Sequence, residues 1–386
     1  MATVRRRKWR NARGEAKSAW VVDYADTNAV RCRKHFSSKK QADAFRVQVE
    51  GQIHAGVYRP DADKMTVQHA AESFLEHCSN RHERDERMTR KMLVVYRGHV
   101  HNYVLHPKYG LGNRKLSQIT ARAVGDFRDA LRGAGVSVPT VRKILASLHA
   151  VLAYAVSQDW VATNAAHRVR VIGARGEGPR RIVPPAKSAI RALLEASDGP
   201  VRVMLMFAAY TGVRAGEQWA ARWSDLDLAA GLLHVRRRVD AYGEEGPPKT
   251  LAGIRAVPLS KQLVASLKAW KLQSHFKTPD ELIFPNNAGR FIGHDNVIKR
   301  HFHPLFRKLD VACLADPARP RVPPFNWHAL RHFAVSCRIE AGLSPKTVQT
   351  FAGHASLQIT MDRYGHLFPR EDHQTTMDRI ALGLFE

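Results

Sequence analysis

Apolar side chains recur with two different spacings in the first part of the chain. Residues 19–24 and 30–36 alternate between apolar and polar side chains, which is typical of β-strands, and the polar segment Asp26-Thr27-Asn28 would turn between them. Residues 39–54 change to helical spacing, with apolar positions at Ala42, Phe45, Val49 and Ile53. We therefore expect a small N-terminal sheet with one helix.

The next hundred residues keep helical spacing throughout. Thr66 stands where an N-cap is expected, directly before the first apolar repeat. Four groups of apolar residues at helical spacing follow. The first is Val67, Ala70, Phe74 and Leu75, and the second is Met92, Val95 and Tyr96. The third is Val124, Phe127 and Leu131, and the fourth is Val141, Ile144, Leu148 and Leu152. Four amphipathic helices of this length predict a small bundle.

Residues 165–185 interrupt the apolar spacing with Arg, Gly and Pro, which predicts an extended basic linker. Beyond it the pattern predicts two short strands at 232–239 and 255–259, and helices near 186–197, 200–210, 260–274, 294–309, 328–340, 344–351 and 356–363. The expected fold is therefore multidomain. A mainly α-helical domain with a small antiparallel sheet (α+β) follows an α-helical bundle and a small β-sheet-plus-helix domain. The predicted boundaries are 1–57, 64–165, 166–185 for the linker, and 186–386.

The net charge of the chain predicts a polyanionic partner. The chain has 61 Lys and Arg against 35 Asp and Glu, a net charge of +26, and the excess is spread over every segment. Such an excess favours nucleic acid or an anionic membrane surface as partner. The longest uncharged apolar run, residues 203–210, is far shorter than the roughly 20 residues of a membrane span. We therefore expect a nucleic-acid-binding protein with no membrane partner.

Cysteine usage indicates a reducing compartment. The chain has four cysteines, and none of them forms a C-x-x-C pair: Cys32, Cys78, Cys313 and Cys337. This spacing argues against both a zinc ribbon and a disulfide framework. A cytoplasmic location follows as an expectation.

One segment resembles the phosphate loop of a nucleotide-binding site. Residues 243–250 match the phosphate-loop pattern, except that a proline stands in place of its second glycine. A phosphate loop works through successive backbone N–H groups, which Pro247 and Pro248 lack. We therefore expect no ATP site here.

Two pairs of residues suit a phosphate group. His328 and Arg331 are three residues apart on a predicted helix, so an imidazole and a forked guanidinium share one face. Arg214 and Glu217 have the same spacing, and the carboxylate can hold the guanidinium in place. Taken separately, the first pair is weak evidence because surface His/Arg pairs are common, and the second is better explained as an ordinary intrahelical ion pair.

The order of the candidate residues along the chain resembles that of the tyrosine recombinases, in particular bacteriophage and prophage integrases. The motifs are Thr-Gly-x-Arg-x-x-Glu at 211–217, Pro-Lys-Thr at 248–250 followed by Arg-x-Val-Pro-Leu at 255–259, His-x-Leu-Arg-His at 328–332, Gly-His at 353–354 and Met-Asp-Arg-Tyr at 361–364. The resemblance covers the chain from about residue 180 to its end. It extends more loosely upstream, where 64–165 would be a core-type and 1–57 an arm-type DNA-binding domain.

The resemblance implies a site-specific recombinase that integrates or excises a phage or mobile element through a 3′-phosphotyrosyl intermediate. Fixed cations can stabilise the phosphate charge without metal, cofactor or ATP. Tyr364 would be the nucleophile, with Arg214 and Arg331 as clamps and Lys249 as the acid for the leaving 5′ oxygen. His354 would bind the phosphate, Glu217 would position its neighbours, and His328 is a candidate proton acceptor, although the choice of histidine stays open.

Several partners follow from the same resemblance. We expect the protein to bind duplex attachment sites and to form a homotetramer on two synapsed DNA sites. We also expect a DNA-bending host protein and a directionality factor to take part, in a bacterial cytoplasm at the nucleoid. The tail at 374–386 would pack either on its own domain or on a neighbouring protomer. Basic residues expected to contact DNA are Arg5, Arg6, Arg7, Lys8, Arg175, Arg180 and Arg181.

Three other functions compete with this one. A type IB topoisomerase would share the chemistry but not the arm-type domain. A non-catalytic or regulatory DNA-binding protein of the same fold would have no need of an intact motif set. An RNA-binding protein would need stacking aromatics on a sheet, for which only Trp20 and Tyr24 are available. The complete motif set favours the recombinase.

Overall fold

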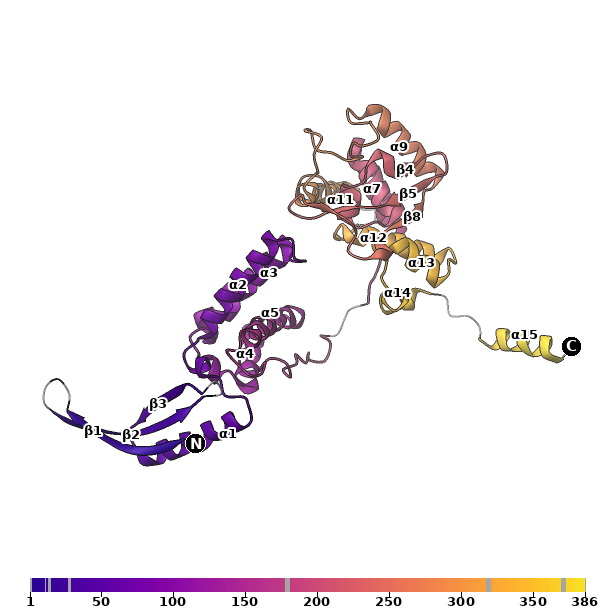
Figure 1. The fold of residues 1–386 in the computed structure, drawn as a ribbon. Helices are drawn as coiled ribbons and strands as arrows, with labels where there is room; N and C mark the ends of the chain where they lie inside the picture. The colour runs from indigo at the N-terminus through magenta and orange to yellow at the C-terminus, as the bar shows by residue number, and fades with distance from the viewer. Residues whose placement is uncertain are drawn as a thin grey trace. The chain divides into compact units, whose positions relative to one another are not determined.

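The computed structural model describes residues 2–10, 12, 15–26, 29–177, 181–316, 321–368 and 373–385. The chain divides into two compact units, Met1–Gly178 and Pro179–Glu386 (Figure 1). Arg180 and most of the expected turn at 26–28 lie outside the described residues.

The first unit begins with a three-stranded antiparallel sheet in the order β1-β2-β3. Its strands are β1 (Thr3–Arg10), β2 (Ala16–Ala25) and β3 (Arg31–Phe36), and helix α1 (Lys39–His54) follows (Figure 1). The sequence predicts β2, β3 and α1, and the structure confirms them. The prediction misses β1 because five of its eight residues are Arg or Lys, which hides the alternation of a strand.

The expected helices of the bundle are also present. They are α2 (Val67–Glu83), α3 (Arg90–His99), α4 (Ala121–Gly133) and α5 (Val138–Ser157), with short turns η1 (Pro60–Asp63), η2 (Val100–Val104), η3 (Pro107–Tyr109) and η4 (Leu116–Gln118). Thr66, Thr89 and Thr120 each accept a hydrogen bond from the backbone N–H three residues later, which fixes where α2, α3 and α4 begin. The buried faces of these helices form one core around Phe127 and Leu148.

The chain after α5 is held against the bundle rather than left fully extended. Arg128 Nη1 donates to the carbonyl of Arg170, and Arg142 Nη2 donates to that of Val171. Arg132 pairs with Glu177 at 2.7 Å. The expected linker is therefore anchored to α4 and α5 as far as Glu177.

The second unit is mainly helical. Its helices are α6 (Lys187–Ala196), α7 (Gly199–Thr211), α8 (Ala215–Trp219), α9 (Lys261–Gln273), α10 (His294–Val297), α11 (His303–Ala315), α12 (His328–Glu340), α13 (Pro345–Ala352), α14 (Leu357–Tyr364) and α15 (His373–Phe385). Its strands are β4 (Leu226–Asp227), β5 (Leu232–Val235), β6 (Arg238–Val239), β7 (Glu245–Gly246) and β8 (Arg255–Pro258). The remaining turns are η5 (Trp223–Asp225), η6 (Leu251–Gly253), η7 (Ile298–Phe302) and η8 (Gly365–Leu367).

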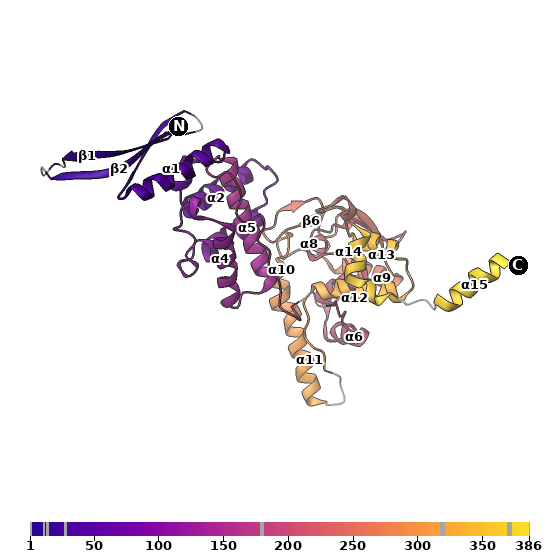
Figure 2. The same cartoon turned by 90° about the horizontal axis from the view of Figure 1, so that it is seen from below.

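The strands of this unit form two small antiparallel sheets, one in the order β4-β5-β8 and one joining β6 to β7. The aromatic side chains of Phe207, Trp219, Phe284 and Phe302 lie in the main core. One helix is expected at 294–309. The structure has a rod of three consecutive elements there, which are α10, the π-helical turn η7 and α11 (Figure 2). None of the described helices is long and apolar enough to cross a membrane.

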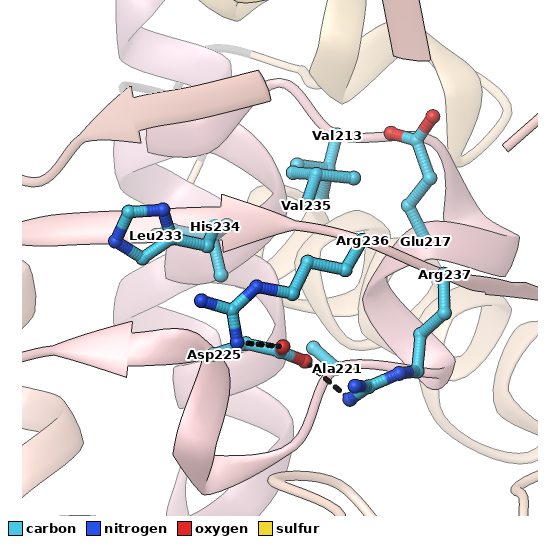
Figure 3. Close-up of a pocket in the computed structure, with 9 residues that line it drawn as sticks. All are labelled: Val213, Glu217, Ala221, Asp225, Leu233, His234, Val235, Arg236 and Arg237. Carbon is cyan, nitrogen blue, oxygen red and sulfur yellow. Dashed lines mark hydrogen bonds and ion pairs between the residues drawn. The ribbon is translucent and has the colours of Figure 1, made fainter. Parts of the chain in front are cut away.

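A buried carboxylate explains why the expected strand at 232–239 is broken. Arg237 Nη1 binds Asp225 at 2.8 Å and Arg236 Nη1 lies 3.6 Å from the same carboxylate, whose side chain is only 2% exposed (Figure 3). Both arginines turn toward η5, so β5 ends before them and β6 starts after them. The cavity beside this cluster measures about 10 Å³, room for one water at most. The cluster is therefore an anchor and not a substrate site.

Candidate active site

Arg214 and Glu217 lie where α7 gives way to α8. Gly212 ends α7 in the left-handed region, at φ +63°, and Arg214 is the N-cap of α8. The carboxylate of Glu217 accepts from the backbone N–H of Arg214 at 2.9 Å and from its Nη1 at 2.7 Å. The ion pair expected from the i,i+3 spacing is therefore present, and Glu217 also closes the first turn of α8.

A third residue joins this pair from strand β8. Arg255 Nη2 lies 2.8 Å from Glu217 Oε2, and both side chains are at most 3% exposed. Burial alone would raise the pKa of Glu217, but Arg255 and Arg214 hold it below its usual range. Glu217 therefore stays ionised between two guanidinium groups, as a buried carboxylate must if it is to orient them.

Three arginines converge on the last turn of α13. The carbonyl of Phe351 accepts from Arg255 Nε at 2.9 Å, and the carbonyl of Gly353 accepts from Arg214 Nη2 at 2.9 Å. The carbonyl between them, that of Ala352, accepts from Arg331 Nη2. Carbonyls at a helix C-terminus lack partners in the helix and carry partial negative charge, so they suit cations. This turn fixes the guanidinium groups relative to one another.

Arg331 also reaches back to the end of α7. Its Nη1 donates to the carbonyl of Gly212 at 2.8 Å, and the residue is 3% exposed. Burial and the neighbouring Arg214 lower the pKa of Arg331 to about 9, so its charge persists at neutral pH. Arg331 therefore ties together the segments that carry Arg214 and His354.

His354 follows α13 directly and is 3% exposed. Its Nδ1 lies 2.9 Å from Oγ1 of Thr360, which is fully buried. Its Nε2 is buried and has no hydrogen-bond partner among the described residues. Burial, reinforced by Arg331 and Arg214, lowers the pKa of His354 to about 3, so the ring is neutral at physiological pH. A neutral ring that accepts from Thr360 at Nδ1 carries its proton on Nε2, ready to donate to a ligand.

Tyr364, the last residue of α14, is fully buried beside these groups. Its ring lies nearly parallel to that of His354, with 6.1 Å between centroids. Burial raises the pKa of the phenol, although Arg331 and Arg363 oppose the effect. Tyr364 is therefore protonated in the resting protein.

The histidine that contacts the phenol is His332, which the sequence does not single out. Its Nδ1 lies 2.6 Å from the hydroxyl oxygen of Tyr364. His328, the candidate proton acceptor, keeps an exposed edge and lies against the His332 ring at 4.9 Å between centroids. Burial of the rest of its ring, with His332 and Arg331, lowers the pKa of His328 to about 4. The structure thus places His332 between His328 and Tyr364.

The other predicted residues lie apart from this cluster. Lys249 is exposed on the loop between β7 and η6 and, among the described residues, takes no part in the hydrogen bonds that join the cluster. Arg5, Arg6, Arg7 and Lys8 lie exposed on β1, and Arg175 and Arg181 are exposed near the boundary between the two units.

Three site residues escape prediction, and each had a signal in the sequence. Arg255 opens the Arg-x-Val-Pro-Leu motif, and His332 follows Arg331 directly. Thr360 precedes Tyr364 by one helical turn, so the two share a face of α14. What the sequence lacks is the information that these three contact the cluster.

The assembled cluster suits attack on a phosphodiester. Arg214 and Arg331 supply fixed positive charge, His354 supplies a buried donor, and Tyr364 supplies a hydroxyl nucleophile with a histidine beside it. In the ranges that the structure describes, no group of three or more His, Cys, Asp and Glu side chains is placed to hold a metal ion.

Comparison with known proteins agrees with this chemistry. Residues 186–371 match the model of the phage integrase family. Prophage integrase IntR of Escherichia coli K12 is 28% identical over 241 residues, which are 60% of this chain and 58% of IntR, so the chain spans less than two thirds of that relative. A tyrosine recombinase XerC-like protein of Caldanaerobacter subterraneus is 26% identical over 90% of this chain and 91% of its own length. The fold is similar to that of a lambda integrase tetramer bound to a Holliday junction, at a TM-score of 0.55 and 16% identity, over 94% of each chain.

Proposed function

Because the chain belongs to the phage integrase family of tyrosine recombinases, we propose that it cuts and rejoins duplex DNA at specific sites. The observation that carries this proposal is the position of the Tyr364 hydroxyl. It lies in one buried cluster with two phosphate-binding candidates, Arg331 and His354, at the end of an apolar core. A tyrosine that served only to pack would have no need of cations on one side and a histidine on the other.

The proposed cleavage step uses the cluster as a phosphate site. Arg214 and Arg331 stabilise the charge that develops on the nonbridging oxygens, and Nε2 of His354 donates to one of them. Tyr364 Oη attacks phosphorus, the bond from phosphorus to the 5′ oxygen breaks, and Lys249 protonates that oxygen. The products are a 3′-phosphotyrosyl enzyme and a free 5′ hydroxyl. Attack by a second 5′ hydroxyl reverses the step, so no ATP is consumed.

Lys249 fits this role because it is exposed and has a flexible side chain. A lysine is a compact charge on a flexible stem, and here it is exposed on a short loop after Pro247 and Pro248. The side chain of Lys249 can therefore reach the DNA backbone once a duplex is bound. The leaving-group acid is therefore the part of the site that DNA has to bring into place.

The first unit would grip DNA on either side of the cleavage point. We propose that residues 1–57 bind arm-type sequences, that residues 64–165 bind the core site, and that residues 166–185 link them to the catalytic domain at 186–386. Cationic side chains in each segment support this division, including the expected DNA contacts of β1 and of Arg175 and Arg181. Such contacts position a protein on the duplex through its phosphates.

Recombination exchanges four strands, so we propose a homotetramer on two synapsed DNA sites. The tetrameric lambda integrase of similar fold supports this assembly. Met377 and Ile380 of α15 are 60% and 51% exposed, which favours packing of this helix on a neighbouring protomer. A DNA-bending host protein and a directionality factor would act on the same complex, in the bacterial cytoplasm at the nucleoid.

The test is covalent capture of DNA. The protein is expressed with the DNA of its source element, the lysate is denatured, and DNA that stays attached is sequenced. The wild type and Tyr210→Phe should yield adducts at one or two sequences, because the hydroxyl of Tyr210 lies on the surface and bonds Gln262. Tyr364→Phe should yield none. Adducts from Tyr364→Phe would contradict the nucleophile, and no adducts from the wild type would favour a non-catalytic DNA-binding protein.

A further inference from the structure

We propose that His332 is a catalytic residue, the base that accepts the proton of Tyr364 during cleavage and returns it during rejoining. The proposal rests on the proposed function of the site. It assigns the base to a residue one helical turn away from His328, the histidine that the sequence motif favours.

The first argument is geometric. Nδ1 of His332 lies 2.6 Å from Oη of Tyr364, which is within the range of a good hydrogen bond and within reach for proton transfer. Because the phenol is protonated, its O–H donates and Nδ1 accepts, which places the proton of a neutral imidazole on Nε2. His332 therefore already has the tautomer that a base needs.

The second argument is electrostatic. Burial, with Arg331 and Arg363, lowers the pKa of His332, so the ring is neutral and able to accept a proton at physiological pH. Burial also keeps the pKa of Tyr364 raised, so the phenol does not ionise by itself. Transfer becomes favourable only when a phosphate brings negative charge to offset the new imidazolium. We therefore expect no proton transfer from Tyr364 to His332 in the free protein, and transfer once the phosphate of a bound DNA lies in the site.

The third argument excludes the neighbouring histidine. The His328 ring lies perpendicular to that of His332, at 89°, and among the described hydrogen bonds none joins it to Tyr364. Its position against His332 suits a residue that orients the base.

The proton balance closes without an external reactant. In cleavage, the Oη–H bond breaks and Nδ1 of His332 takes the proton while Oη bonds to phosphorus. The departing 5′ oxygen takes its proton from Lys249, as in the proposed mechanism. In rejoining, the attacking 5′ hydroxyl gives its proton to Lys249 as its oxygen bonds to phosphorus, and the leaving phenolate recovers the proton from His332. Each half-reaction therefore moves one proton between Tyr364 and His332 and one between Lys249 and the 5′ oxygen, and the two half-reactions together restore all three side chains.

The pH dependence of this step is set by the groups around His332. Those that face it are His328 and Arg331 of its own helix, α12, and Arg363 and Tyr364 of α14. On the other elements packed against α12, Arg202 of α7 bonds the carbonyl of Leu194 and Tyr210 of α7 bonds Gln262. Lys346 of α13 bonds Gln349, and His366 of η8 bonds the carbonyl of Ile182. Two histidines and two arginines, His332, His354, Arg331 and Arg363, thus lie around the phenol, and of the described residues only His332 bonds its hydroxyl.

The test compares three asparagine variants of the full chain. In His332→Asn, Oδ1 can still accept the hydrogen bond of Tyr364 but cannot take up its proton. His328→Asn removes the orienting ring, and His301→Asn changes an exposed histidine of η7 as a control. Single-turnover cleavage of a nicked DNA site, found by the covalent capture above, is followed between pH 5.5 and 9.

His332→Asn should cleave about 100-fold more slowly than the wild type at pH 7 and recover as the pH rises, because direct ionisation of the phenol replaces the base. His301→Asn should behave as the wild type. His328→Asn should keep the shape of the wild-type pH profile even where its rate falls. A wild-type rate and profile for His332→Asn would overturn the proposal, as would a loss of rate equal at every pH.

A second readout does not depend on DNA cleavage. With 3-fluorotyrosine placed at position 364, ¹⁹F NMR follows the ionisation of this phenol in the free protein. The fluorine signal should respond to the titration of His332 in the wild type and lose that response in His332→Asn. A wild type that forms no DNA adduct would count against the proposed function alone, whereas an unchanged fluorine titration in His332→Asn would count against the pairing.

Discussion

A β-carbon at Gly353 would lie 2.8 Å from Nη1 of Arg255. Gly353 ends α13 at φ +65°, in the left-handed region where side chains are disfavoured. Its bare backbone lets the Arg255 guanidinium pass close enough to bond the carbonyl of Phe351 and the carboxylate of Glu217. The glycine of the Gly-His motif therefore makes room for an arginine that joins α13 to the carboxylate of Glu217.

Replacing Gly353 should test the two reasons for a glycine here, which are its left-handed backbone and the space that it leaves for Arg255. Gly353→Ala should lower the free energy of unfolding by about 2–4 kcal/mol, since a left-handed backbone strain adds to a steric clash. Gly342→Ala is the matched control, because Gly342 has φ +79° but open space at its β-carbon, and it should lose only about 1–2 kcal/mol. Urea unfolding measures both values.

Cleavage should distinguish the two glycines further. Gly353→Ala displaces Arg255, so it should lose most DNA cleavage under conditions where it remains folded, while Gly342→Ala retains it. Equal losses of stability in the two variants would show that the contact with Arg255 has no energetic weight.

Thr360 should control the proton position on His354. Thr360→Val keeps the shape of a fully buried side chain but removes the hydroxyl that bonds Nδ1 at 2.9 Å. The buried Nδ1 then loses its partner, at a cost of about 1–3 kcal/mol, and the ring is free to carry its proton on the wrong nitrogen. We expect cleavage to fall by at least about 10-fold with DNA affinity unchanged.

Thr360→Ser restores the hydroxyl and is the control for this prediction. It should recover most of the cleavage rate, as measured by phosphotyrosyl adduct formed in a single turnover. If Thr360→Val and Thr360→Ser cleave equally fast, the hydroxyl does not set the tautomer of His354.

The sequence was sufficient for most elements because their apolar periods are regular. Helix α1 begins and ends where its spacing predicts, at Lys39 and His54. The failures have local physical causes. Strand β1 is hidden by its cationic side chains, and the strand expected at 232–239 is broken because Arg236 and Arg237 turn to a buried carboxylate.

The site was predictable only as far as its motifs reach. Motif order names Arg214, Arg331 and Tyr364, and the i,i+3 spacing gives the Arg214–Glu217 ion pair. No local pattern indicates that Arg255 bonds the carbonyl of Phe351, which lies ninety-six residues further along the chain. For the same reason, the choice between His328 and His332 needed the distance to a hydroxyl on another helix.

His354 should make the stability of the protein depend on pH. Its pKa of about 3 in the folded state lies below the ordinary value of 6.5, so folding favours the neutral ring. The stabilisation is complete above pH 6.5 and is lost as the pH falls toward 3. Between pH 8 and pH 5, this residue should account for a loss of about 2 kcal/mol in the free energy of unfolding.

His354→Asn isolates that contribution, since an amide can still bond Thr360 but does not titrate in this range. Urea unfolding at pH 8 and pH 5 should show a loss about 2 kcal/mol smaller in His354→Asn than in the wild type. An identical loss in both proteins would mean that His354 is not buried in its neutral form.

Strand β1 divides its five cations between the two faces of the N-terminal sheet. Val4 packs in the core with Val22 and α1, so Arg6, two residues further, points to the side that α1 covers. Arg5 and Arg7 point to the opposite face, where Arg5 and Arg33 share the carboxylate of Asp23. Among the described residues no carboxylate pairs with Arg7, so its charge is available to a phosphate.

If this open face binds DNA, the two neighbouring arginines should differ in the salt dependence of binding. Each phosphate contact contributes about 0.9 to the slope of the logarithm of the binding constant against the logarithm of salt concentration. Arg7→Ser in the full chain should therefore reduce the slope by about 0.9 on a random-sequence duplex, whereas Arg6→Ser should leave it almost unchanged. Fluorescence anisotropy between about 50 and 200 mM salt measures both slopes. An equal reduction in the two variants would place DNA along the strand edge, and a reduction in Arg6→Ser alone would place it on the face of α1.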